Sequence, residues 1–166
     1  MVSHGIISPM LFLIAGVIYD RAHTRDIEGF GGLAEKLPEY TGLTGLAFMA
    51  SLGLPGLAGF IGEVMVFLGA FGSPNPAFKG LVVVAALSVI ITAAYYLWTM
   101  QRMFLGKLNE KWAGLWDMNW RERITLYPLA AITVILGVWP APVFSLINTS
   151  LRDVLQVVES GLRAGF

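Results

Sequence analysis

Cysteine is absent from this sequence, and charged side chains are scarce. Without cysteine the chain forms no disulfide and offers no thiolate ligand to a metal or an iron–sulfur centre. Asp, Glu, Lys and Arg make up only 13% of the chain, whereas soluble domains usually carry about 25%. A chain with so little polar surface cannot cover its own apolar residues in water, so the composition favours a membrane. The formal net charge of zero provides no general attraction to nucleic acid.

The few charges are confined to clusters between long apolar stretches. No charged residue precedes Asp20, and Glu63 is the only one between Glu39 and Lys79. Residues 80–101 and 124–151 are also free of charge. Each stretch approaches or exceeds the roughly 20 residues that cross about 30 Å of hydrocarbon. The sequence therefore predicts an all-α, multi-pass integral membrane protein with four transmembrane helices, at residues 2–19, 43–71, 80–103 and 124–147.

The first apolar stretch does not have the features of a signal peptide. No basic segment precedes it, and no small-residue cleavage site follows it. After the fourth predicted helix, apolar residues at helical spacing predict an amphipathic interfacial tail at residues 148–164. Trp112, Trp116 and Trp120 recur every fourth residue, which indicates either a helix on the membrane surface or a loop packed against protein.

The second predicted helix contains several helix-breaking residues: Gly53, Pro55 and Gly56, followed by Gly59 and Gly62. Proline removes a backbone donor and clashes with the preceding turn, while glycine lowers the cost of unwinding. We therefore predict two half-helices that are joined by a non-helical piece at Gly53–Gly56 inside the membrane. A simple proline kink is the alternative.

Two ionisable residues are candidates for proton transfer. Glu63 follows the predicted break, at a depth where a carboxylate is costly unless it is paired, hydrated or protonated. The alternative for Glu63 is a neutral acid that hydrogen-bonds to a neighbouring helix. His4 lies in the first predicted helix, where an imidazole can relay protons or simply face water. His23 lies in the charged linker and is expected to be solvated, and the two histidines predict no metal site.

The placement of Lys and Arg predicts the orientation of the chain. Of the 11 Lys and Arg residues, three lie in the linker before residue 43 and five lie from Arg102, at the end of the third predicted helix, to Arg123 in the linker that follows it. Positive residues accumulate in the cytoplasmic loops of membrane proteins. We therefore expect both linkers on the cytoplasmic side and the C-terminus outside.

Four segments resemble a known family. They are SHGIISPMLFLIAGVIYDRAHTRDIEGFGGL at residues 3–33, FMASLGLPGLAGFIGEVMVFLGAF at 48–71, QRMFLG at 101–106 and GVWPAPVFSLI at 137–147. They are similar to the C-terminal part of subunit M of bacterial NADH–quinone oxidoreductase (complex I, chain 4 in mitochondria), which belongs to the antiporter-like subunits. The resemblance implies that residues 1–166 are the C-terminal portion of one antiporter-like membrane domain.

The resemblance also implies the roles of particular residues. The glutamate of the family's broken helix falls on Glu63, and a histidine of its hydrophilic axis falls on His4. The family's glutamate and lysines of earlier helices would precede Met1, so the chain is expected to be a fragment of a longer subunit. Proton translocation coupled to NADH:quinone oxidoreduction is the implied function.

Cofactors and partners follow from the same resemblance. No redox cofactor is expected on this chain, which lacks both cysteine and a GxGxxG segment after a strand. NADH, flavin, iron–sulfur centres and quinone would be bound by partner subunits. Expected partners are neighbouring antiporter-like subunits, a long lateral helix and the lipid bilayer of the cell (inner) membrane. The alternatives are a subunit of a multisubunit cation/proton antiporter or membrane-bound hydrogenase, and a non-transporting remnant that only packs against partners.

Overall fold

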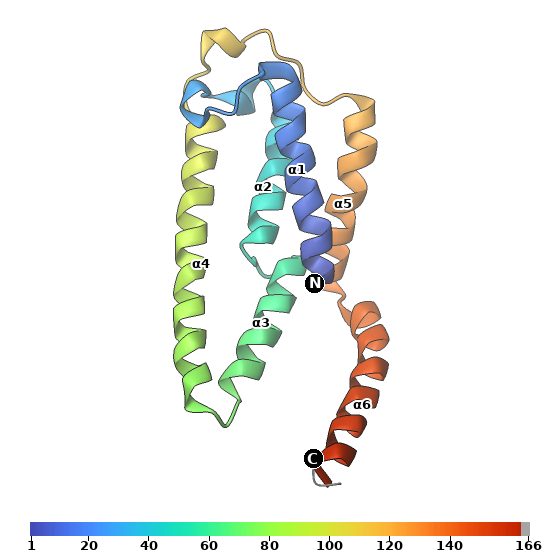
Figure 1. Cartoon of the computed structure of the whole chain (residues 1–166). Helices are drawn as coiled ribbons and strands as arrows, with labels where there is room; N and C mark the ends of the chain where they lie inside the picture. Colours follow the sequence, from blue (N-terminus) through green and yellow to red (C-terminus); the bar gives the residue numbers. More distant parts are fainter. Residues whose placement is uncertain (164–166) are drawn as a thin grey trace.

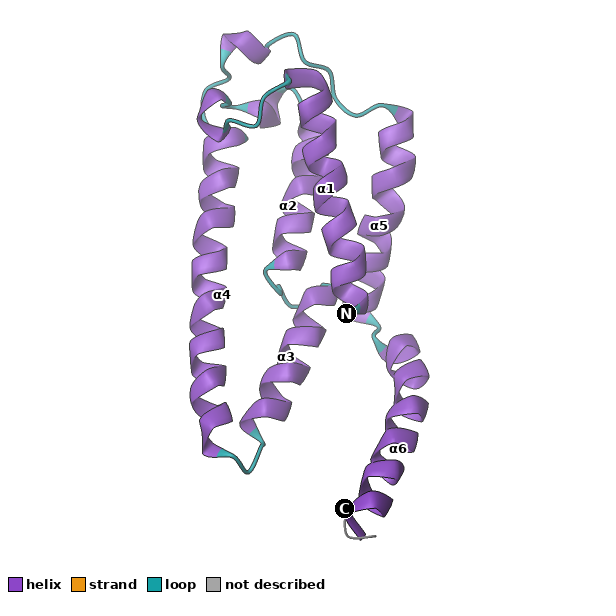
Figure 2. Ribbon diagram, in the orientation of Figure 1, coloured by secondary structure: helices purple, strands orange, loops and turns teal. Residues whose placement is uncertain are grey.

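The computed structural model describes residues 1–163, and this part of the chain is helical without any strand. Figure 1 shows the arrangement of the helices and Figure 2 the loops that join them. The prediction of an all-α chain is confirmed. The α-helices are α1 (Val2–Ala22), α2 (Pro38–Ser51), α3 (Ala58–Phe71), α4 (Pro76–Met103), α5 (Trp120–Val138) and α6 (Ala141–Arg163).

Local sequence signals determine where several helices begin. Pro38 and Pro76 each lie in the first turn of a helix, where a missing N–H costs nothing and the fixed φ is suitable. Asn75 caps α4 through a hydrogen bond from the backbone N–H of Ala77. Asn119 and Glu122 form a capping box at the start of α5. These signals place the starts of α2 and α4 four or five residues before the predicted ones.

The fourth predicted helix is not continuous. In the structure, α5 ends at Val138. Helix α6 begins at Ala141 and includes the rest of the predicted helix and residues 148–163 of the predicted tail. Pro140 separates the two helices, since proline cannot supply the N–H that a continuous helix would need. The axes of α5 and α6 differ by 74°. Ala164, the final residue of the predicted tail, lies outside the described residues.

The lengths of the helices bear on the four predicted crossings. Only α1 and α4 are, as single helices, long and apolar enough to cross a membrane, and α5 with residues 141–158 forms a third, bent candidate. Both α2 and α3 have 14 residues, or about 21 Å each, which is short of a 30 Å hydrocarbon layer. By length and composition the described residues therefore contain two or three candidate spans, which does not confirm the four predicted crossings.

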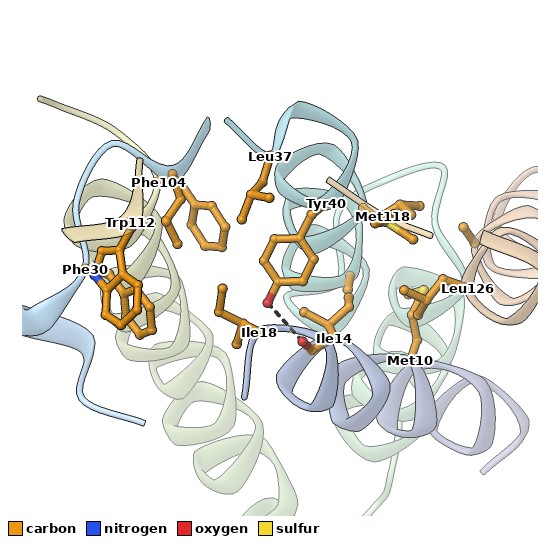
Figure 3. Close-up of a cluster of buried hydrophobic side chains, with 14 residues drawn as sticks. Met10, Ile14, Ile18, Phe30, Leu37, Tyr40, Phe104, Trp112, Met118 and Leu126 are labelled. Carbon is orange, nitrogen blue, oxygen red and sulfur yellow. Dashed lines mark hydrogen bonds between the residues drawn. The ribbon is translucent and has the colours of Figure 1, made fainter. Parts of the chain in front are cut away.

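The main hydrophobic core lies near the end of the bundle that carries both linkers (Figures 1 and 3). Ile14 and Ile18 of α1 lie near Tyr40 of α2 within it, and Met10 of α1 belongs to the same cluster. The hydroxyl of Tyr40 donates a hydrogen bond to the carbonyl of Ile14 at 2.9 Å, which satisfies this polar group inside the core. The remaining buried members are Phe30, Leu33, Leu37, Leu43, Ala47, Phe104, Trp112, Met118, Leu126 and Ala130.

Polar contacts join the helices at the same end. The guanidinium of Arg21 forms two hydrogen bonds with the carboxylate of Glu122, at 2.7 and 2.9 Å, and its side chain is only 4% exposed. Asp117 accepts hydrogen bonds from the backbone N–H groups of Glu39 and Tyr40 at the start of α2. Arg123 pairs with Glu39 at the surface. These contacts tie α1, α2 and α5 together.

The three tryptophans of that linker do not share one helix face. Trp112 is buried, stacks on Phe30 and donates a hydrogen bond to the carbonyl of Gly29 at 2.9 Å. Trp116 and Trp120 are exposed, and only Trp120 belongs to α5. The surface-helix interpretation was therefore wrong, and the packed-loop alternative holds for Trp112.

Candidate functional site

The break between α2 and α3 covers residues 52–57. Gly53 and Gly56 adopt φ values of 77° and 91°, a region that favours glycine. The N–H of Leu54 donates to the carbonyl of Met49 at 3.0 Å, and that of Leu57 donates to the carbonyl of Leu54 at 3.1 Å. The chain thus makes a tight, hydrogen-bonded turn rather than a bent helix. The predicted break at Gly53–Gly56 lies inside this segment, and the kink alternative was wrong.

Close contacts from three helices hold the break in place. A Cβ atom at Gly59 would collide with the carbonyl of Ala50, so glycine allows α3 to approach the end of α2. A Cβ atom at Gly137 of α5 would collide with the backbone of Gly56 and Leu57. From α1, the hydroxyl of Ser3 donates to the carbonyl of Ala58 at 2.8 Å. Sequence reasoning missed Gly137, because one glycine near the end of an apolar helix gives no distinguishing signal.

Glu63 lies in the second turn of α3 and is partly buried. Its carboxylate rests against the backbone of Gly53, where a Cβ atom would collide with Oε2. The missing side chain of Gly53 therefore makes the space that the carboxylate occupies. The two ion pairs found among the described residues both lie at the linker end, so neither involves Glu63.

His4 and Glu63 line the same cavity, which has a volume of about 420 Å³. The hydroxyl of Ser8 lies 3.1 Å from Nε2 of His4. Ser3 and Ser51 also line the cavity. Hydroxyl, imidazole and carboxyl groups around one space can exchange protons with water held between them. Gly62 lines it as well, and a Cβ atom there would meet open space, so packing does not require glycine at that position.

Glu63 also lines a second cavity, of about 200 Å³, on the side of α4. Ser88 and Thr92 of α4 contribute hydroxyl groups to its wall, and Ser51 contributes from the end of α2. Ser88 and Thr92 both fall within the third predicted helix, at residues 80–103. Ser51 was missed, since a serine beside a helix break also commonly serves as a simple cap.

No group of three or more His, Cys, Asp or Glu side chains that could hold a metal ion occurs in the described part of the chain. The site is therefore built around one carboxylic acid, one imidazole and several hydroxyl groups. Such groups suit the transfer of protons.

Comparison with known proteins places the chain among membrane proteins. The family model for the transmembrane part of NADH:quinone oxidoreductase and Mrp antiporter subunits matches residues 1–92. NADH-quinone oxidoreductase subunit M of Rhodobacter capsulatus is 42% identical over 98% of this chain. F(420)H(2) dehydrogenase subunit M of Methanosarcina mazei is 42% identical over 93% of it. The chain covers 31% and 30% of these two relatives, respectively, and so spans about a third of their length.

A solved structure supports the same placement. A chain of respiratory complex I from Thermus thermophilus, determined with bound NADH, superposes with a TM-score of 0.74 and 34% sequence identity. The match covers 84% of this chain and 28% of that one. The protein is accordingly a multi-pass protein of the cell membrane. The chain belongs to the family of transmembrane subunits that NADH:quinone oxidoreductases and Mrp antiporters share.

Proposed function

We propose that this chain is part of the proton-translocating machinery of a respiratory complex I, in which proton transfer is coupled to the reduction of quinone by NADH. The observation that carries the proposal is the position of Glu63, whose carboxylate rests in a helix break and faces a cavity that His4 also lines. An enzyme of this kind would carry NADH, flavin, iron–sulfur centres and quinone on its other subunits. This chain would contribute to the enzyme as a membrane-arm subunit without a redox centre of its own.

The proposed role of Glu63 follows from the energetics of a carboxyl group within a membrane. An unpaired carboxylate is costly there, so its charge depends on water and on neighbouring charges. The turn at residues 52–57 exposes backbone groups that can hold water beside it. A cation approaching from another part of the complex would favour the charged form, and its withdrawal would favour uptake of a proton. His4, hydrogen-bonded to Ser8, would pass protons to or from the same cavity.

We propose that four segments cross the membrane: α1, α2 with α3, α4, and α5 with the first turns of α6. Together α2 and α3 contain 28 residues (14 in each helix), the same number as the unbroken α4. In this proposal residues 1–166 form the C-terminal portion of one antiporter-like domain. Neighbouring antiporter-like subunits and a long lateral helix would cover its outer surface.

The relative from Methanosarcina mazei favours a second candidate for the electron donor. It is named as a subunit of F(420)H(2) dehydrogenase and is as similar to this chain as the Rhodobacter capsulatus protein. Proton transfer through Glu63 would be the same in both complexes, because the donor would bind to another subunit. Oxidation of NADH or of reduced F420 by membranes that contain the protein distinguishes the two candidates.

Substitution of Glu63 tests the proposed function. In the assembled complex, Glu63→Gln keeps the shape of the side chain but cannot titrate, so we expect a strong loss of proton pumping. Quinone reduction would fall with it if the two processes are tightly coupled. Glu63→Asp retains the acid and should retain more activity than Glu63→Gln. Pumping at the wild-type rate by a fully assembled Glu63→Gln complex would overturn the proposal.

A further inference from the structure

Helix α4 carries a polar stripe on one face. Ser88, Thr92 and Tyr96 recur every fourth residue, a spacing that places side chains on the same side of a helix. Ser88 and Thr92 line the 200 Å³ cavity that Glu63 also lines. The hydroxyl of Tyr96 lies 2.8 Å from that of Ser51, at the end of α2. The stripe thus faces the break between α2 and α3.

The hydrogen bonds within the stripe leave its oxygens able to accept further ones. The hydroxyl of Ser88 donates to the carbonyl of Ala85 at 2.6 Å, and that of Thr92 donates to the carbonyl of Ser88 at 3.1 Å. A hydroxyl group that has used its single donor still has acceptor capacity. The cavity wall therefore presents acceptors to water or to a protonated group.

The position of Tyr96 is fixed by its ring. Tyr96 stacks on Phe48, with ring centroids 4.5 Å apart and an angle of 23° between the planes. Phe48 also lines a larger and mainly apolar groove between α1, α2 and the end of α4. The stacking therefore fixes the Tyr96 ring with its hydroxyl toward Ser51.

Ser51 connects the two sides of the site. It lines the cavity that contains His4 and also the cavity on the side of α4. Glu63 is the other polar residue that lines both. Ser51 and Glu63 therefore border both spaces, one on the side of α1 and the other on the side of α4.

We propose that Ser51 and Tyr96 form a second arm of the proton path, in which hydroxyl groups carry protons between Glu63 and the linker-side end of α4. This inference rests on the function proposed for Glu63. Each hydroxyl accepts one proton and releases another, so no group in the arm changes its net charge after a transfer. Eight residues separate Ser88 from Tyr96 along the helix, so the stripe extends over about 12 Å.

Removal of single hydroxyl groups tests the second arm in the assembled complex. Tyr96→Phe keeps the ring that stacks on Phe48 and loses only the hydroxyl, and Ser51→Ala removes the partner hydroxyl. We expect each change to slow proton translocation roughly tenfold, since a positioned proton-transfer group typically contributes at least that much. Ser51→Thr keeps a hydroxyl and should retain most of the wild-type rate of proton translocation. The solvent isotope effect on pumping should rise in Tyr96→Phe, because the impaired proton transfer becomes rate-limiting.

Tyr95→Phe is the matched control, because Tyr95 is the adjacent residue of the same type, whereas the hydroxyl that lies within hydrogen-bond distance of Ser51 is that of Tyr96. We expect wild-type pumping from it. Equal slowing by Tyr95→Phe and Tyr96→Phe would overturn the inference. Wild-type pumping by Tyr96→Phe together with loss of pumping in Glu63→Gln would also overturn it, while leaving the proposed function intact. Wild-type pumping by Glu63→Gln would overturn both.

Discussion

At the scale of single residues, the site depends on the contact between Gly53 and Glu63. The two residues belong to different halves of the broken segment, and the carboxylate fills the space that a side chain on Gly53 would take. Sequence reasoning identified both residues, one as a helix breaker and the other as a buried acid. It did not connect them, because a contact across a turn depends on the path of the backbone through residues 52–57.

Gly53→Ala tests this contact. Alanine at a φ of 77° is strained, at a cost of about 1–2 kcal/mol, and its Cβ atom would displace the Glu63 carboxylate. We expect a lower thermal stability of the purified protein and a marked loss of proton pumping in the assembled complex. Combining Gly53→Ala with Glu63→Asp, which shortens the acid, should recover part of the pumping.

Gly56→Ala is the control for backbone strain alone. Gly56 has a φ of 91°, and a Cβ atom there would meet nothing within 4 Å. We expect a similar loss of thermal stability but little loss of pumping per assembled complex. An equal loss of pumping in both variants would show that strain in the turn, rather than displacement of Glu63, limits the function.

At the scale of helices, the sequence predicted one break and missed another. Glycine on both sides of Pro55 indicated the break between α2 and α3, since both residue types weaken a helix. The fourth predicted helix ran through Pro140 and Pro142 to residue 147, whereas α5 ends at Val138 and α6 begins at Ala141. A proline alone does not reveal whether a helix ends there or is followed by a second helix in another direction, because that depends on what the following residues contact. The positions of Ser51 and Gly137 in the site depended on packing between helices in the same way.

The ion pair between Arg21 and Glu122 joins α1 to α5, and its removal should loosen the bundle. The Arg21 side chain is 4% exposed, and its loss would leave the Glu122 carboxylate without its partner. We expect Arg21→Ala to destabilise the protein by roughly 3 kcal/mol. Arg123→Ala is the control, since Arg123 is 46% exposed in its pair with Glu39, and such surface pairs contribute about 0–1 kcal/mol. Denaturation in detergent measures both, and equal effects would contradict a dominant role for the buried pair.

At the scale of the whole molecule, the two linkers lie at one end of the bundle, while the turn between α3 and α4 and the C-terminal end of α6 lie at the other (Figure 1). The distribution of Lys and Arg predicts that the linker end is cytoplasmic. Single cysteines at the exposed positions Glu35, Glu110 and Ser160 report the orientation without background, since the native chain has no cysteine. An impermeant thiol reagent should label only Ser160→Cys in intact cells. Labelling of Glu35→Cys or Glu110→Cys instead would reverse the orientation.

The isolated chain should not pump protons. The described residues place no cationic side chain in an ion pair with Glu63, and the proposed mechanism needs a charge that approaches and withdraws. We therefore expect no proton flux when the 166-residue chain is reconstituted alone into liposomes that contain a pH-sensitive dye. The complete complex in the same liposomes is the positive control. Sustained, inhibitor-sensitive flux from the chain alone would contradict the requirement for partners.

The hydrophobic core is distributed unevenly along the molecule, and this affects how easily its helices can move. Among the described residues, α4 contains no buried side chain and α3 contains only Ala58, whereas the core gathers near the linkers. Segments with few buried apolar contacts are displaced at low free-energy cost. We therefore expect α3 and α4 to move more readily than the helices around the core, with the turn at residues 52–57 as the hinge. Because Gly53 belongs to this turn and Glu63 to α3, a small movement of α3 about the turn would change the surroundings of the Glu63 carboxylate.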